Sequence, residues 1–196
     1  MARHPISVLA VETAEERETL TQLWLSASVE SGISPEVASR RASQGVVELA
    51  LQRPDVYGFL ACVDGEAVGF IVASESVMRF GEGDELVIEQ IYVSEKARKH
   101  GVARALLHTT TSLAERLGFD RIASAVPSSA RDANRFFARL GFGPAVTRRV
   151  ASVSAVRRRV APHESSSSLD RLLHLRRSMR AREQSLPKAM PARQIG

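Results

Sequence analysis

The chain has 196 residues, 44% hydrophobic and 25% charged, and a formal net charge of +5, which is typical of a globular protein with one sizeable core. Its apolar runs are too short to span a bilayer, its first residues lack the apolar segment of a signal peptide, and its single cysteine, Cys62, excludes an internal disulfide. We therefore expect a cytoplasmic protein that does not bind a membrane.

The first half of the chain predicts a strand, two helices and a hairpin. Thr13 and Glu16 have the spacing of a capping box, and Ser34-Pro35 is typical of a helix start. Asp64-Gly65 separates two apolar runs and suits a tight hairpin turn. The expected elements are a strand at 6–10, helices from 14 and from 35 to about 51, and strands at 56–63 and 67–74.

The second half predicts alternating strands and helices. A further capping box is expected at Ser129–Asp132, and Gly118 and Gly141 are suited to end helices. The expected elements are a strand at 86–93, a helix at 101–117, a strand at 121–126, a helix ending at 140, and two β-like pieces within 146–160. This order predicts an α+β fold of α/β/α layers, in which about four helices flank a mixed central sheet of about seven strands.

The segment from Val93 to Ala103 leaves a strand and enters a helix. Gly101 and Ala103 are small, so the backbone there can approach a ligand closely. The first amides of a helix lack internal acceptors and suit a pyrophosphate, to which Arg98, Lys99 and Arg104 would add charge. The alternative is an ordinary strand–helix turn with solvated basic residues.

The pattern Arg98-x-x-Gly101-x-Ala103, following a strand that ends at Val93, resembles the acetyl-CoA loop of the GNAT acyltransferase superfamily. The helix after the loop, the strand at 121–126 and the helix that closes with Leu-Gly-Phe at 140–142 resemble the family's core in the same order. The resemblance covers about residues 5–160. We therefore expect a GNAT-like acetyltransferase domain at 1–160 and a basic tail at 161–196.

The resemblance implies a site and a reaction. The strand before the loop would splay from its neighbour at a bulge, the pantetheine arm of CoA would lie along the strand, and the pyrophosphate would meet the loop. An amine would then attack the acetyl thioester of acetyl-CoA directly, with no metal. The cofactor-binding residues expected are Ile91, Tyr92, Val93, Arg98, Lys99, His100, Gly101, Val102, Ala103, Arg104, Asn134 and Phe137.

Glu89 is the candidate general base, because it interrupts an apolar strand four residues before Val93. Burial tunes a carboxylate toward accepting a proton near neutral pH, and an amine must lose a proton to attack. The alternative is that Glu89 faces solvent or pairs with an arginine. Asp84 and Glu85 are weaker candidates for the same role.

Two positions depart from the family's pattern. The tyrosine that often protonates the departing thiolate is replaced by Phe137, and the family's frequent asparagine corresponds to Ala130. Asn134 lies one turn later and is either its substitute or an ordinary polar helix residue. Two functions therefore remain: an N-acetyltransferase acting on an amine of a small molecule, peptide, protein or RNA-linked acceptor, or a non-catalytic module of the same fold.

The C-terminal tail carries the basic charge. Residues 151–196 contain 10 Lys and Arg but 3 Asp and Glu, whereas residues 1–150 contain 17 and 19. Leucines at helical spacing predict a basic amphipathic helix at about 168–183. This helix would dock on the domain or on a second copy in a homodimer, form part of a disordered tail, or bind RNA, the ribosome or an acidic protein through residues 157–182.

Overall fold

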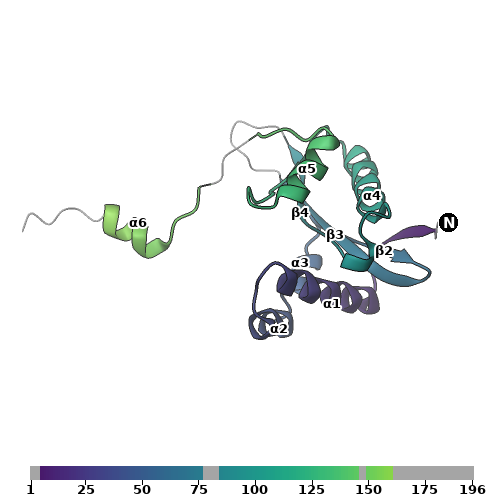
Figure 1. Cartoon of the computed structure of the whole chain (residues 1–196), viewed down its shortest axis with the longest axis horizontal. Helices are drawn as coiled ribbons and strands as arrows, with labels where there is room; N and C mark the ends of the chain where they lie inside the picture. Colours follow the sequence, from purple (N-terminus) through teal and green to yellow (C-terminus); the bar gives the residue numbers. More distant parts are fainter. Residues whose placement is uncertain (1–4, 77–83, 146–148, 161–196) are drawn as a thin grey trace, which may run out of the picture. The chain divides into compact units, whose positions relative to one another are not determined.

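The computed structural model describes residues 5–76, 84–145 and 149–160 of the chain. Two compact units are present, Met1–Gly143 and Pro144–Gly196 (Figure 1). The domain boundary expected after residue 160 and the tail helix expected at about 168–183 stay predictions, because residues 161–196 lie outside the described part. Within the described ranges, no helix has the length and apolar character needed to cross a membrane.

The first unit contains a single sheet of five strands in the order β1-β2-β3-β4-β5. All neighbouring strands are antiparallel except β4 and β5, which are parallel. Asp64 and Gly65 both have positive φ, +51° and +82°, which confirms the predicted tight turn between β2 and β3. The strands are β1 (Ile6–Ala10), β2 (Val56–Val63), β3 (Glu66–Ser76), β4 (Glu85–Val93) and β5 (Ile122–Ser124).

Six α-helices are present in the described residues, and most begin where local chemistry predicts. The capping box of Thr13 and Glu16 is confirmed, and the Ser34 hydroxyl accepts the amide of Val37. The helix expected from 35 to 51 is divided in two because Gly45 has a φ of +69°. The helices are α1 (Ala14–Glu30), α2 (Pro35–Ser43), α3 (Val46–Leu51), α4 (Val102–Leu117), α5 (Arg131–Arg139) and α6 (Val153–Val160).

Three predictions about the C-terminal half are wrong. The described residues form five strands instead of about seven, and α6 occupies part of the segment where two β-like pieces were expected. Val153, Val156 and Val160 recur at helical spacing, and the Ser152 hydroxyl accepts the amide of Ala155, so a helix is the better fit. The second capping box is absent, because Ala130 precedes α5 and makes no side-chain cap.

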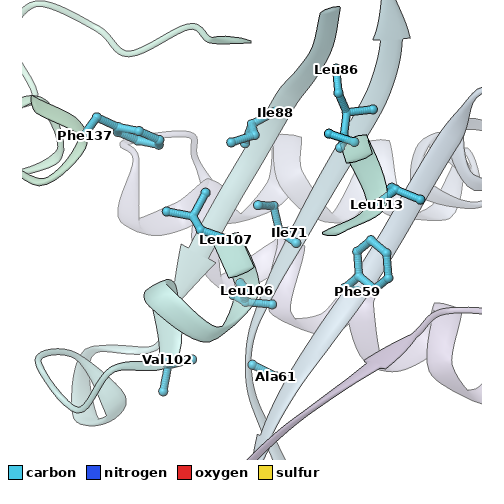
Figure 2. Close-up of a cluster of buried hydrophobic side chains, with 12 residues drawn as sticks. Phe59, Ala61, Ile71, Leu86, Ile88, Val102, Leu106, Leu107, Leu113 and Phe137 are labelled. Carbon is cyan, nitrogen blue, oxygen red and sulfur yellow. The ribbon is translucent and has the colours of Figure 1, made fainter. Parts of the chain in front are cut away.

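The hydrophobic core lies on both faces of the sheet, in α/β/α layers (Figure 1). One cluster packs α4 and α5 against the sheet and includes Ile71, Ile88 and Leu106 (Figure 2). The other packs α1 and α3 against the opposite face and includes Leu20 and Phe70. Helices therefore cover both faces of the sheet, and a site has room only at the ends and edges of its strands.

Candidate active site

Strands β4 and β5 pair over a short distance and then separate. Leu86, Val87 and Ile88 pair with the three residues of β5, whereas β4 continues to Val93. Within the described part of the chain, no strand pairs with that edge of β4 from residue 89 onward. The backbone of Ile91–Val93 therefore borders an unpaired strand edge, at the place where the family resemblance implied that β4 splays from its neighbour.

A β-bulge marks the point of separation. On β3, Val72 lies opposite Gln90 while the next residue, Ala73, lies opposite Ile88, so Glu89 is an extra residue in β4. The bulge shifts the alternation of side chains, and Ile88 and Ile91 both pack on the α4 side of the sheet. Glu89 is consequently turned out of the core at the point where the two strands part.

The expected burial of Glu89 is wrong, because the bulge leaves its side chain exposed. The Ser74 hydroxyl donates a hydrogen bond to Glu89 Oε1 at 2.6 Å. Ser74 lies at the end of β3, and sequence reasoning missed it because the contact depends on the irregular register of the β3–β4 pair. Glu89 thus has an accessible carboxylate held by one neighbour, which keeps it available to accept a proton.

Other acidic groups lie near the start of β4. Asp84 is exposed, whereas Glu85 is 3% exposed and its Oε2 lies 3.8 Å from Arg121 Nη2. The Tyr57 hydroxyl donates to Glu75 Oε1 at 2.6 Å, and this hydrogen bond, with burial, raises the pKa of Tyr57 to about 12. The phenol therefore stays protonated at neutral pH and cannot act as a base there.

The loop between β4 and α4 has an unusual backbone. After a 3₁₀ turn at Glu95–Ala97, Lys99 has a φ of +66° and Gly101 a φ of +96°. The backbone amides of residues 99–104 donate to no acceptor among the described residues. Val102 is 1% exposed and anchors the start of α4 in the core, so this residue offers its amide and not its side chain.

Side chains of the loop differ in what they contact. His100 and Arg104 are exposed, and Ala103 is half-buried. Lys99 is exposed and lies close enough to Asp132 of α5 for its charge to contribute, after the larger effect of Arg135, to lowering the pKa of Asp132. The loop therefore combines unbonded amides with cationic side chains, an arrangement that suits an anion.

Arg98 is directed toward α1. Its Nε donates to the Val93 carbonyl oxygen at 3.0 Å, and its Nη2 donates to Glu30 Oε1 in an ion pair. The hydrogen bond that Arg98 donates to Glu30 raises the pKa of Arg98. Sequence reasoning placed Arg98 in the loop but missed Glu30, because the two residues are far apart in the chain and no local pattern joins them.

The remaining predicted cofactor residues line the end of β4. Ile91 and Val93 pack on the α4 side, and Tyr92 packs on the α1 side with its ring centroid 6.0 Å from that of Phe70. Burial, followed by the negative charge of Glu30, raises the pKa of Tyr92. The side chain of Tyr92 therefore contributes to the core.

Asn134 and Phe137 both belong to α5. Asn134 Nδ2 donates to the carbonyl oxygens of Pro127 and Ala130 at 2.8 and 2.9 Å, so its amide ties down the preceding loop. Phe137 (Figure 2) is 5% exposed. Its ring packs edge-on against that of Phe142, with the two ring centroids 5.0 Å apart. Whether either residue contacts a cofactor stays a prediction.

The described residues contain no cluster of three or more His, Cys, Asp or Glu side chains placed to hold a metal ion. The arrangement offers a carboxylate, Glu89, that suits acid–base chemistry, and a set of loop amides at 99–104 that suits an anion. The two are joined by the unpaired edge of β4.

The chain is similar in sequence and in fold to known proteins. Residues 17–142 match the model of the acetyltransferase (GNAT) family. No curated protein matches the chain.

Solved structures share the fold at low sequence identity. A putative acetyl transferase from Pyrococcus furiosus is 20% identical with a TM-score of 0.66, over 76% of this chain and 100% of that chain. A ribosomal-protein-alanine N-acetyltransferase from Brucella melitensis biovar Abortus 2308 is 19% identical with a TM-score of 0.61, over 76% and 99%. The aminoglycoside N-acetyltransferase AAC(6')-Iy, in complex with CoA, is 21% identical with a TM-score of 0.60, over 76% and 93%.

Proposed function

The chain belongs to the GNAT acetyltransferase family, and on this basis we propose that it transfers the acetyl group of acetyl-CoA directly to an amine. The observation that carries the proposal is the unpaired edge of β4 from Glu89 to Val93, which leads to the unbonded amides of residues 99–104. A strand edge and a set of helix-start amides are the two groups needed to hold an extended amide-containing arm that ends in a pyrophosphate.

The backbone geometry of β4 and of the loop after it fits CoA. Backbone donors and acceptors of Ile91–Val93 face no strand among the described residues on the β5 side. Lys99 and Gly101 have positive φ, a backbone feature that also occurs in anion-binding nests. When bound, acetyl-CoA would supply an activated thioester, and these backbone groups would position it.

Glu89 acts in this proposal as the proton acceptor for the attacking amine. It is exposed where β4 and β5 part, and the Ser74 hydroxyl fixes one of its oxygens at 2.6 Å. The other oxygen is free to accept a proton directly or through water. Phe137 has no hydroxyl that could protonate the CoA thiolate. Because a thiol has a pKa of about 8.5, the thiolate can leave without being protonated by an acid.

The acceptor is proposed at the level of an amine. Proteins of similar fold are named for aminoglycosides and for a ribosomal-protein alanine, which are acceptors of very different size. An amine of a small molecule, peptide, protein or RNA-linked acceptor therefore remains the substrate class. Glu89, which is exposed where β4 loses its β5 partner, would favour a cationic amine over an anionic one.

Release of CoA thiol from acetyl-CoA tests the proposal. The whole chain is incubated with acetyl-CoA and, in separate reactions, an aminoglycoside, a polyamine and peptides with different N-terminal residues. We expect amine-dependent thiol release, in step with an acetylated product identified by its mass, for at least one acceptor. Thiol release that never exceeds the rate without an amine, across all acceptor classes, would contradict the proposal.

A second candidate function is a non-catalytic module of this fold that acts through its basic end. Phe137 supports it, because a buried phenylalanine stands where the family often has an acid, and so do Arg157–Arg159 on α6. In this case a second copy, RNA, the ribosome or an acidic protein would be the partner. Binding of RNA by the whole chain, abolished on replacing Arg157–Arg159 with serines while no amine is acetylated, would favour this function.

A further inference from the structure

The side chain of Arg98 joins three parts of the fold. It leaves the start of the cofactor loop, its Nε donates to the carbonyl oxygen of Val93 at the end of β4, and its Nη2 donates to Glu30. Glu30 is the last residue of α1, on the opposite side of the sheet from α4. We call this set of contacts, Glu30–Arg98–Val93, the Arg98 bridge.

Helix stability does not explain the position of Glu30. The carbonyl end of a helix carries partial negative charge, so a carboxylate there is unfavourable, and the last turn of α1 has no basic residue to offset it. Arg98 supplies the offsetting charge from another element. The carboxylate of Glu30 thus has its cationic partner in the loop and not in its own helix, and it also lies close to Tyr92 of β4.

The loop needs contacts from outside itself. Lys99 has a positive φ, a conformation that disfavours residues with a side chain, and Gly101 has another two residues later. Among the described residues, the side chains of Lys99 and His100 make no hydrogen bond or ion pair, so the contacts of Arg98 are the nearest side-chain anchors. Losing them would leave a strained loop free to relax.

We propose that Glu30 is a positioning residue for the cofactor: acting through Arg98, it holds residues 98–104 in the conformation that presents their amides. Arg98 is then part of a bridge to α1 and not a ligand of the pyrophosphate. This inference rests on the proposed function in one respect, since the molecule positioned is acetyl-CoA.

The two roles of Arg98 predict effects of opposite sign. If Arg98 were a phosphate ligand, Glu30 would compete for it and repel the anionic cofactor, and Glu30→Ala would strengthen CoA binding. If the bridge positions the loop, Glu30→Ala weakens CoA binding about two- to fivefold, the effect that a partly exposed ion pair can supply. Glu30→Gln keeps an acceptor oxygen for Arg98, so its affinity should lie between those of the wild type and Glu30→Ala.

Glu48→Ala is the matched control. Glu48 pairs with Arg17 at 3.1 Å, its side chain is 44% exposed as is that of Glu30, and the pair lies between α1 and α3, away from the loop. CoA is titrated by calorimetry into the wild type and each variant of the whole chain. We expect weaker binding in Glu30→Ala, unchanged binding in Glu48→Ala, and a KM for acetyl-CoA that rises while kcat stays constant.

Hydrogen exchange of the free protein tests the bridge without any ligand. The amides of Ala97, Arg98 and Ala105 are bonded to carbonyl oxygens within the loop region and report its opening. We expect them to exchange faster in Glu30→Ala than in Glu48→Ala. A wild type that binds no CoA would contradict the proposed function, and the exchange rates would still decide the bridge.

Two results would overturn the inference. One is CoA binding by Glu30→Ala that is unchanged or tighter than in the wild type. The other is exchange at these three amides that is the same in Glu30→Ala and the wild type.

Discussion

Replacing Gly101 with alanine separates the role of the loop's backbone from the stability of the fold. Gly101 precedes α4 with a φ of +96°, and a side chain in the left-handed region costs about 1–2 kcal/mol. An added Cβ would lie 3.7 Å from Ile6 Cδ1, which is ordinary contact, so no clash adds to this strain. We expect Gly101→Ala to lower the Tm by roughly 2–8 °C, the shift that about 1–2 kcal/mol gives for a chain of this size.

We expect Gly101→Ala to reduce the free energy of CoA binding by more than it reduces the free energy of unfolding. Relieving the strain at Gly101 rotates the peptide planes beside it and redirects at least one of the amides at 99–104. A hydrogen bond to a charged group contributes about 1.5–3 kcal/mol, and about 1.4 kcal/mol corresponds to a tenfold change in Kd. Calorimetric titration should therefore find CoA bound about 10- to 100-fold more weakly by Gly101→Ala.

Gly118→Ala is the control, because it carries the same strain at the other end of α4. Gly118 has a φ of +84°, and its Cβ would meet no atom within 4 Å. We expect a similar loss of Tm and an unchanged affinity for CoA. The reasoning is refuted if Gly101→Ala binds CoA as tightly as the wild type, or if Gly118→Ala weakens binding to the same extent.

Three further substitutions test other residues of the site. Glu89→Gln should lower the rate of acetyl transfer about 10²–10⁴-fold, most strongly at low pH where little free amine exists, and should leave the affinity for acetyl-CoA intact; a pH–rate profile like that of the wild type would remove Glu89 from the mechanism. Phe137→Tyr places a hydroxyl at a position that is 5% exposed, so it should lower the unfolding free energy by roughly 1–3 kcal/mol without faster turnover. A variant with faster turnover and an unchanged Tm would contradict this expectation. Glu75 helps to raise the pKa of Tyr57 from 10.0 to about 12, so the protonated phenol stabilises the fold at and below pH 10 and this contribution is lost as pH rises through 12. Thermal melts of Tyr57→Phe should therefore show a smaller fall in Tm over this range than the wild type, and an equal fall would count against the interaction.

The loop and the base show how far the sequence could predict the site. Gly101 and Ala103 after a strand were enough to locate the unbonded amides, because a helix start and a small residue are local features. Glu89 was expected to be buried, but its side chain is exposed. Its burial depended on regular alternation, and the bulge ended that alternation between Ile88 and Ile91.

Contacts between distant residues were not predictable. Glu30 meets Arg98, and Ser74 meets Glu89, only once the packing of α1 and the register of β3 are known. No periodic pattern in one sequence carries that information.

Short segments were misassigned when two periods fitted the same residues. The valines of 153–160 fit a helix as well as parts of a strand, and the sheet that would have paired them is not formed there in the described residues. Gly45 divides the second predicted helix because its positive φ is incompatible with continuing the helix, whereas a glycine alone does not reveal its φ.

Calorimetric titration of acetyl-CoA into the whole chain tests the central claim most directly. The account predicts saturable binding of one acetyl-CoA per chain and a Tm that rises with its concentration, since a ligand at 100 times its Kd adds about 2.7 kcal/mol to the unfolding free energy. No heat of binding, together with a Tm that acetyl-CoA does not change, would contradict the assignment of the β4 edge and residues 99–104 as a CoA site.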